Sequence, residues 1–455
     1  MPGYADWKLI YKEEYVAMYE EGYDVSHALM PCDVQELLPF PGRTVELDHE
    51  SHIDWRVEYE RLWACRKQGL RADYPYREPT TWDEMRAEFP PLPTLVPLSA
   101  EAYEDRLSGA VNGRIAGVIL GKPFEMGMDR RAIRAYLESI GEYPLMDYAS
   151  PYSSALDRHL RADCLPSTKG NIHYAQPDDD IHYTLLALRL AEKHGLRFTP
   201  YDIGINFLEN IPYHWCWCAS RQAYYRMVNM ETERSMEEQL AMIPWEGNPW
   251  RECIDGQIRT DLWGYLFPGD PRGAAEIAYR DCSFSLAKNG CYGGMFVAGC
   301  IASALTANPT VDEILDGGLS VIPQRSRLAE TIRWVRERYA MTNDWEVVCQ
   351  EIETRFAKMA FAGTMNNLAM TVLALLHGNL DYTKTITCAV SCGIDTDCNG
   401  GTAGSICGAA IGRCGIEDRW LTPLQDTIHS CVAEIGYIGI SELVDRIINL
   451  HKNIK

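Results

Sequence analysis

The chain has 455 residues, of which 46% are hydrophobic and 24% charged, and its formal net charge is −21. This length leaves room for a large core, while the acidic balance argues against a nucleic-acid partner held by a basic surface. The sequence shows no secretory signal pattern and no uninterrupted apolar run long enough to cross a bilayer, so a cytoplasmic protein without a membrane partner is expected.

A proline-rich stretch, residues 89–97, divides the chain into two regions because it fits neither a helix nor a central strand. Residues 1–98 form an N-terminal extension of mixed or irregular structure, with amphipathic helical patches near residues 9–19 and 53–63 and no assignable chemistry. Residues 99–455 show helical periodicity and helix caps, with few alternating runs. The sequence therefore predicts an all-α main domain preceded by an extension.

The first helix of the main domain carries Gly109, Gly113, Gly117 and Gly121 at four-residue spacing, which places them on one stripe. Interior glycines cost about 1 kcal/mol each relative to alanine, so a neighbouring backbone is expected to pack unusually close. A second ridge of glycines at residues 404, 408 and 412 follows an acidic cluster, and close helix contact there would hold the acidic loop in place. Charged residues in the first helix argue against a transmembrane dimer.

The first acidic cluster is Asp178, Asp179 and Asp180, at the start of a predicted helix over about residues 181–194. Gly195 fits the C-cap of that helix. One hypothesis is that one of these aspartates caps the helix while the others favour its positive end.

The second acidic cluster, Asp395 and Asp397, stands at the start of another predicted helix. If the two clusters met without a cation, their five carboxylates would repel one another strongly. Mg²⁺ and Mn²⁺ prefer oxygen ligands and would remove that conflict. A shared metal site is therefore the second hypothesis for both clusters.

The sixteen cysteines are expected to be reduced, mostly small core residues rather than a disulfide framework. The groups Cys216 to Cys218 and Cys388 to Cys392 lack the paired spacings of a zinc site, so no structural zinc is expected.

Four segments of the chain resemble the ADP-ribosylglycohydrolase family, and they occur in the order of that family. They are residues 113–117, residues 121–125, the acidic helix start at Asp178, and residues 393–397 before a small-residue helix. The resemblance covers about residues 105–445. It implies an all-α orthogonal multi-helix bundle with two Mg²⁺ ions, with Mn²⁺ as an alternative, and hydrolases that remove ADP-ribose from arginine or serine side chains.

The resemblance also implies roles for individual residues. The metal ligands would be Asp178, Asp179, Asp180, Asp395 and Asp397, and the mobile-loop glutamate would be Glu125. Asp179 or Asp180 would orient or deprotonate a water, and Glu125 would act as the acid or gate. Without the resemblance, the preferred interpretation of Glu125 is a solvated residue that follows a helix-ending proline.

The chain departs from the family pattern at several positions. Asp178 replaces a threonine ligand, so the metal site is expected to differ in charge, and residues 181–183 look like an insertion. Cys398 stands where a second liganding threonine is usual. Because a thiol is a poor ligand for Mg²⁺, Cys398 is interpreted as a packing residue that would touch only a softer metal.

Substrate contacts are harder to assign, because residues 283–294 lack the histidine that many relatives carry there. The candidate contacts are Asn289, Gly290, Tyr292 and Arg259. The alternative for the first three is a glycine-rich turn that opens a helix over about residues 295–305. The alternative for Arg259 is an ion pair with Asp261 or Asp255.

The implied chemistry is cleavage of a glycosidic bond at C1 of a ribose, through an oxocarbenium-like transition state. The first hypothesis is a Mg²⁺-dependent hydrolase of ADP-ribosylated substrates, and the second is an N-ribosyl hydrolase of a small ribosylated metabolite or nucleoside. The third is a non-catalytic binding or structural relative, which the retained carboxylates argue against. The oligomeric state is left open.

Overall fold

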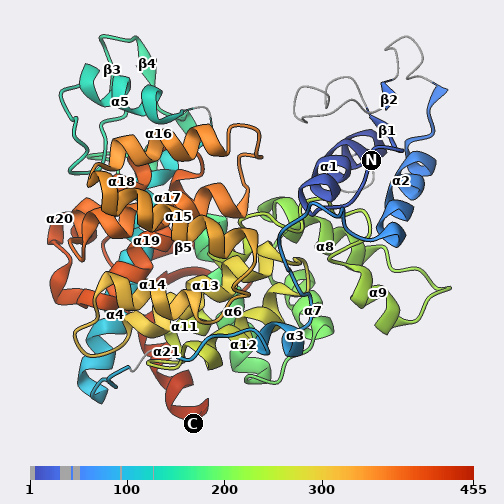
Figure 1. The fold of residues 1–455 in the computed structure, drawn as a ribbon. Coiled ribbons are helices and arrows are strands. Elements are labelled where there is room, and N and C mark those ends of the chain that lie inside the picture. The colour runs from blue at the N-terminus through green and yellow to red at the C-terminus, as the bar shows by residue number, and fades with distance from the viewer. Residues whose placement is uncertain (1–5, 31–42, 45–51, 93–94, 127, 455) are drawn as a thin grey trace.

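The computed structural model describes residues 6–30, 43–44, 52–92, 95–126 and 128–454. Helices make up most of this part of the chain, as the periodicity predicts (Figure 1). The α-helices are α1 (Trp7–Glu20), α2 (Trp55–Ala64), α3 (Trp82–Arg86), α4 (Ala100–Gly121), α5 (Arg130–Ser139), α6 (Asp179–His194), α7 (Pro200–Asn210), α8 (Cys218–Val228), α9 (Met236–Met242), α10 (Asp255–Arg259), α11 (Asp261–Tyr265), α12 (Pro271–Cys282), α13 (Asn289–Ala304), α14 (Val311–Leu319), α15 (Arg327–Thr342), α16 (Trp345–Arg355), α17 (Thr364–Gly378), α18 (Tyr382–Ser391), α19 (Thr396–Ile411), α20 (Asp418–Leu421) and α21 (Ile440–Ile454). Short 3₁₀ turns are η2 (Cys65–Gln68), η3 (Lys122–Phe124), η4 (Ala162–Ser167), η5 (Tyr213–Trp215), η6 (Arg413–Gly415) and η7 (Thr422–Leu424). Within the described ranges, no helix combines the length and apolar character needed to cross a bilayer.

Strands are few and short in the described residues. The parallel pair is β1 (Leu29–Met30) with β2 (Arg43–Thr44), and the antiparallel pairs are β3 (Tyr152–Ser153) with β4 (Arg158–His159) and β5 (Thr427–Val432) with β6 (Ile435–Gly439). The β5–β6 hairpin, which the sequence did not indicate, has an irregular register between His429 and Val432. Ala175 donates to Thr427 O at 2.7 Å and accepts from His429 N at 3.0 Å. The hairpin therefore fixes the chain just before the first acidic cluster.

The glycine stripe of α4 packs against α19, whose ridge also consists of glycines. A Cβ atom at Gly117 would lie 2.1 Å from the carbonyl oxygen of Gly400, and one at Gly113 would lie 2.4 Å from that of Gly404. Such distances leave no space for any side chain on the stripe. The expected close packing is confirmed, and its partner is the helix that follows the second acidic cluster.

The helix starts differ slightly from the sequence-based expectation. Helix α6 begins at Asp179 rather than near residue 181, and Gly195 ends it with φ of 63°, as expected. Helix α13 begins at Asn289, so the glycine-rich turn expected before residue 295 is wrong. The glycines belong to the helix because the backbone of another segment crosses it closely. A Cβ atom at Gly290 would lie 2.3 Å from Arg251 O.

Two hydrophobic clusters lie in the described residues. The larger one fills the main helical body, and it includes Met85 of α3, so the chain joins this body before the proline-rich stretch. The smaller one lies between α1 and α2, around Tyr11, Tyr15, Met18 and Leu62. In Figure 1, α1 and α2 stand together at one side of the main body, next to α8 and α9.

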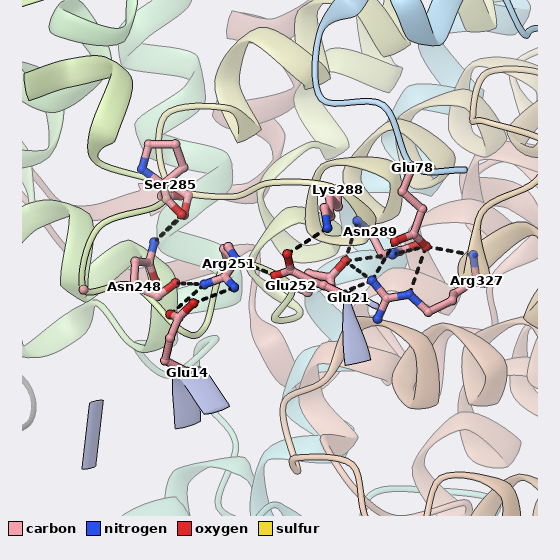
Figure 2. A network of polar contacts seen from close by, with 12 residues as sticks. Glu14, Glu21, Glu78, Asn248, Arg251, Glu252, Ser285, Lys288, Asn289 and Arg327 are labelled. Atoms are coloured by element: carbon pink, nitrogen blue, oxygen red, sulfur yellow. Dashed lines mark hydrogen bonds and ion pairs between the residues drawn. The ribbon is translucent and has the colours of Figure 1, made fainter. Parts of the chain in front are cut away.

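Buried ion pairs join the extension to the main body, as Figure 2 shows. We call these residues the docking network: Glu14, Glu21, Glu78, Arg251, Glu252, Lys288 and Arg327. Arg251 is fully buried and contacts Glu14 at 2.8 Å and Glu21 at 2.5 Å. Lys288 Nζ lies 2.8 Å from the second oxygen of Glu21. Arg327 contacts Glu78 at 2.7 Å and Glu252 at 2.8 Å. The extension thus supplies three of the four carboxylates that neutralise buried cations of the main body.

Candidate metal centre

The structure brings the two acidic clusters and Glu125 together at three helix ends. Asp178 is the N-cap of α6, and its Oδ1 accepts a hydrogen bond from Asp180 N at 3.0 Å. Asp395 is the N-cap residue of α19 but makes no side-chain capping bond, so its carboxylate is left for another role. Glu125 follows η3 at the end of α4. The hydroxyl of Thr396 donates to Gly121 O at 2.8 Å, which ties the start of α19 to the end of α4.

Three groups of ligand atoms overlap at this point. In each group, one side-chain atom of every member lies within 4.8 Å of the others, and the groups are Asp178, Asp179 and Asp180; Asp180, Asp397 and Cys398; and Glu125, Asp395 and Asp397. Asp180 and Asp397 each belong to two groups, so all three groups form one continuous site. We call its six carboxylates, those of Glu125, Asp178, Asp179, Asp180, Asp395 and Asp397, the acidic centre. Asp179 and Glu125 keep some exposure to solvent and mark its mouth.

The carboxylates of the acidic centre carry more negative charge than their neighbours balance. Burial, reinforced by the neighbouring carboxylates, raises the pKa of Asp179 and Asp395 well above the usual range. Burial also raises the pKa of Asp180 well above that range, although Arg114 opposes the shift. Burial and the charges of Asp397, Asp178 and Asp179 raise the pKa of Glu125 to about 9. A proton or a cation must therefore compensate these groups.

Asp178 is the exception, because it has its own cation. Burial disfavours its ionised form, but Lys122, with Nζ at 2.5 Å from Oδ2, lowers the pKa of Asp178 overall. The positive charge of Lys122 therefore compensates the negative charge that Asp178 brings where the family has a threonine. Both of its oxygens already have a partner, Lys122 and the N–H of Asp180.

The residues present fit a hard divalent cation. The donors are carboxylate oxygens from separate elements, the ligand type that Mg²⁺ and Mn²⁺ prefer. Oδ1 of Asp395 is buried and has no hydrogen-bond partner among the described residues. A buried, unpartnered carboxylate oxygen is costly unless a cation or another ligand meets it. Cys398 donates its thiol to Asp180 Oδ2 at 3.1 Å, an arrangement that suits a packing and hydrogen-bonding role.

Arg114 positions Asp180 from beneath the site. This guanidinium is buried in α4 and donates to Asp180 O at 2.7 Å and to Ile258 O at 2.6 Å. Its second terminal nitrogen lies 2.9 Å from Asp261. Sequence reasoning did not assign Arg114 or Lys122 a role at the site. A signal was present in the sequence. Arg114 is the one charged residue between Gly109 and Gly121, and Lys122 directly follows Gly121.

Two further residues contact or follow members of the acidic centre. Arg161 Nη1 donates to Glu125 Oε2 at 2.8 Å. His182 belongs to the segment interpreted as an insertion, and burial lowers its pKa to about 4, so the ring is neutral near pH 7. Its Nε2 accepts from Cys431 N at 3.1 Å, which leaves the proton on Nδ1. That buried Nδ1–H has no partner within the described structure, and Trp215 packs edge-on against the ring.

The four candidate substrate contacts lie elsewhere, at positions committed to other protein groups. Asn289 donates to Glu78 at 2.8 Å and Glu252 at 2.7 Å, beside the docking network (Figure 2). Gly290 packs against the backbone of Arg251, and the hydroxyl of Tyr292 donates to Pro79 O. Arg259 is buried, pairs with Asp281 at 3.3 Å and donates to Ser285 at 2.9 Å. The alternative named Asp261 or Asp255 as the ion-pair partner of Arg259, and this is wrong because the partner is Asp281.

Comparisons with known proteins agree with this architecture. Residues 99–453 match the family model described as ADP-ribosylglycohydrolase. Among solved structures, one described as "ADP-ribosylglycohydrolase-related protein complex" aligns with a TM-score of 0.50 and 18% identity, covering 78% of this chain and 100% of that one. At that identity the likeness shows the fold alone. Comparison with curated protein sequences gives no significant match. The family model spans most of the chain, and this protein therefore belongs to the ADP-ribosylglycohydrolase family, whose members are glycohydrolases of ADP-ribosyl-type substrates.

Proposed function

We propose that the protein is a divalent-metal-dependent hydrolase that cleaves a ribosyl glycosidic bond of an ADP-ribosylated substrate. The observation that carries this proposal is the convergence of six carboxylates from three helix ends on one partly open site. Family membership supports the reaction class. A merely structural scaffold would gain nothing from keeping a surplus of buried negative charge.

The acidic centre would hold the metal ions, two Mg²⁺ or alternatively Mn²⁺. The proposed ligands are Asp178, Asp179, Asp180, Asp395 and Asp397, with Asp178 the least available because of its ion pair. When bound, the ions would supply Lewis-acid stabilisation of the ribose hydroxyls and a water of lowered pKa. Arg114 and Lys122 hold Asp180 and Asp178 in place and so fix the spacing of the ligand set.

The residues at the mouth would handle the protons. Asp179, partly exposed, is placed to orient or deprotonate the attacking water, with Asp180 fixed behind it by Arg114. Burial and the neighbouring carboxylates raise the pKa of Glu125 to about 9, and Arg161 donates a hydrogen bond to its carboxyl group. A carboxyl group with a raised pKa can act as the general acid for the leaving group.

The first test is isothermal titration of Mg²⁺ and Mn²⁺ into the metal-stripped protein and into the variants Asp179→Asn and Asp395→Asn. Two-ion binding that is lost in both variants is expected. Asp381→Asn is the matched control, because Asp381 is an aspartate that caps a helix, α18, and lies outside the acidic centre. Unchanged binding in both site variants would mean that the clusters are helix caps, and the proposal would then fail.

The second test addresses the acid. Glu125→Gln should keep the metal affinity within a few-fold but reduce turnover by about 10²–10⁴-fold, the usual contribution of general acid–base catalysis. The measurement is hydrolysis of ADP-ribosyl-arginine and ADP-ribosyl-serine peptides under saturating Mg²⁺. Turnover equal to that of the unaltered protein would remove Glu125 from the mechanism.

A second candidate function is hydrolysis of a small N-riboside, and the position of Arg259 favours it. This arginine is the one cation among the four candidate substrate contacts, and it is already paired with Asp281 inside the main body. Comparing each ADP-ribosyl compound with the same riboside lacking its diphosphate separates the two functions. Activity that survives removal of the diphosphate supports the small-molecule hydrolase. Metal binding without turnover of either class supports a non-catalytic relative.

A further inference from the structure

A second group of metal-ligating side chains lies outside the acidic centre. The Sγ atoms of Cys218 and Cys253 and one carboxylate oxygen of Asp255 all lie within 4.8 Å of one another. Cys253 and Asp255 are buried, whereas Cys218 keeps some exposure. The sequence analysis expected no structural zinc, because the two cysteines of this group are 35 positions apart and lack the spacing of a zinc motif.

The backbone fixes each of these three residues without help from an ion. Cys218 is the first residue of α8 and has φ of 42°, a conformation that L side chains rarely adopt. Cys253 donates its N–H to Trp250 O at 2.9 Å and accepts from Thr364 Oγ1 at 2.7 Å. Asp255 begins α10, and its Oδ1 accepts from Ser220 N at 2.9 Å. These contacts hold the start of α8 against the start of α10, which is what a preformed site requires.

The donor set differs in kind from that of the acidic centre. Two thiol sulfurs and one carboxylate oxygen suit a thiophilic cation such as Zn²⁺, whereas an all-oxygen set suits Mg²⁺. Three protein ligands around a tetrahedral cation leave a fourth position, which a water would fill on the partly exposed side of Cys218. Asp255 Oδ1 accepts from Ser220 N, and one carboxylate oxygen of Asp255 lies within 4.8 Å of both sulfurs.

We propose that Cys218, Cys253 and Asp255 form a second metal site for one Zn²⁺-like cation, which pins α8 to α10. Ser220 of α8 already donates to Asp255 of α10, so the cation would reinforce the contact between the starts of these two helices.

The test uses the full chain, stripped of metal under reducing conditions and then saturated with Mg²⁺ so that the acidic centre does not compete. Co²⁺ is titrated as the probe, since its bonds to thiolates give a charge-transfer absorption. One equivalent of Co²⁺ with this absorption is expected, and one equivalent of Zn²⁺ should displace it. Cys253→Ser and Cys218→Ser should abolish the absorption, while Asp255→Asn should weaken Co²⁺ binding by about tenfold or more.

Cys282→Ser is the matched control, because Cys282 is a buried cysteine of α12 outside this group. Far-ultraviolet circular dichroism checks that each variant is folded. If the buried Cys253→Ser variant unfolds, the partly exposed Cys218→Ser variant decides the question. Absence of the absorption, or its persistence in a folded cysteine variant, would overturn the proposal. A Cys218–Cys253 disulfide found by mass spectrometry after purification without reductant, together with no Zn²⁺ uptake after reduction, would do the same.

Discussion

The docking network and the acidic centre are both sets of buried charges, but they are balanced in different ways. In the docking network, Glu21 faces both Arg251 and Lys288, and Arg327 faces both Glu78 and Glu252. In the acidic centre, six carboxylates meet few cations, chiefly Lys122, Arg114 and Arg161. The comparison teaches that buried charge matched within the chain serves the fold, whereas unmatched buried charge identifies a place for a ligand.

The largest effect is expected from breaking the docking network. Arg251→Met would leave Glu14 without its cation and Glu21 with Lys288 alone, in a fully buried environment. Removing one partner of a buried pair costs about 3–5 kcal/mol, so the free energy of unfolding should fall by that amount in a urea titration. Lys384→Met, at an exposed pair with Asp381, is the control and should change it by about 0.5 kcal/mol or less. A loss below about 1 kcal/mol at Arg251 would contradict the structural role.

The next effect concerns the helix contact that holds the acidic centre. Gly117→Ala would place a Cβ atom 2.1 Å from Gly400 O, so α4 and α19 must separate. We expect a cost of about 1–3 kcal/mol in unfolding free energy, as for other overpacked cores, together with weaker Mg²⁺ binding. Gly436→Ala has nothing within 4 Å of its Cβ and should leave both quantities unchanged. If Gly117→Ala binds Mg²⁺ as tightly as the unaltered protein, the contact between α4 and α19 does not hold the acidic centre in place.

A smaller effect should appear as a pH dependence of the metal-free protein. The folded-state pKa of Glu125 is about 9, above its value in an unfolded chain, so the folded state binds more protons between the two values. Stability is then full below about pH 4.5 and falls as the pH rises toward about 9. The thermal midpoint in chelator should fall across this window, and saturating Mg²⁺ should flatten the decline. Asp179, Asp180 and Asp395 also have raised pKa values and act in the same direction, so Glu125→Gln should reduce the decline without abolishing it, and an unchanged decline would remove Glu125 from this effect.

The smallest effect is expected at Cys398, whose thiol donates to Asp180. Cys398→Ser keeps a donor at the same position, so the Mg²⁺ affinity should change by no more than about 1 kcal/mol, or roughly fivefold. Titration calorimetry measures this directly. A much larger loss would indicate that the sulfur itself contacts the cation.

The glycine spacing and the acidic helix starts allowed much of the architecture to be predicted from the sequence. Glycines spaced four apart indicate close packing of a neighbouring helix. Caps and periodicity predicted the first residues of α6 and α19 to within about two positions. The pairing of Lys122 with Asp178 and of Arg114 with Asp180 was not predicted, because the partners are 56 and 66 positions apart. A local sequence pattern cannot predict ion pairs between residues so far apart in the chain.

Residues 289–292 show the opposite limit. Asn289, Gly290 and Tyr292 are candidate contacts because they lie where many relatives carry a substrate-facing histidine. In the structure their groups meet Glu78, Arg251 O and Pro79, contributed by the extension and by the segment before α10. Contacts of this kind depend on how distant segments meet, so the 3.6-residue periodicity of one helix cannot reveal them.

The docking network also sets an order of events during synthesis. Glu14 leaves the ribosome 237 residues before its partner Arg251, and Glu78 leaves 249 residues before Arg327. At about 5–20 residues per second, α1 waits on the order of 10–50 s for the cations that neutralise it. During that interval its carboxylates stay hydrated, and the helix can dock only after the chain around Arg251 has emerged. We therefore expect a nascent chain arrested before residue 251 to expose α1 to protease, and one arrested well beyond residue 327 to protect it.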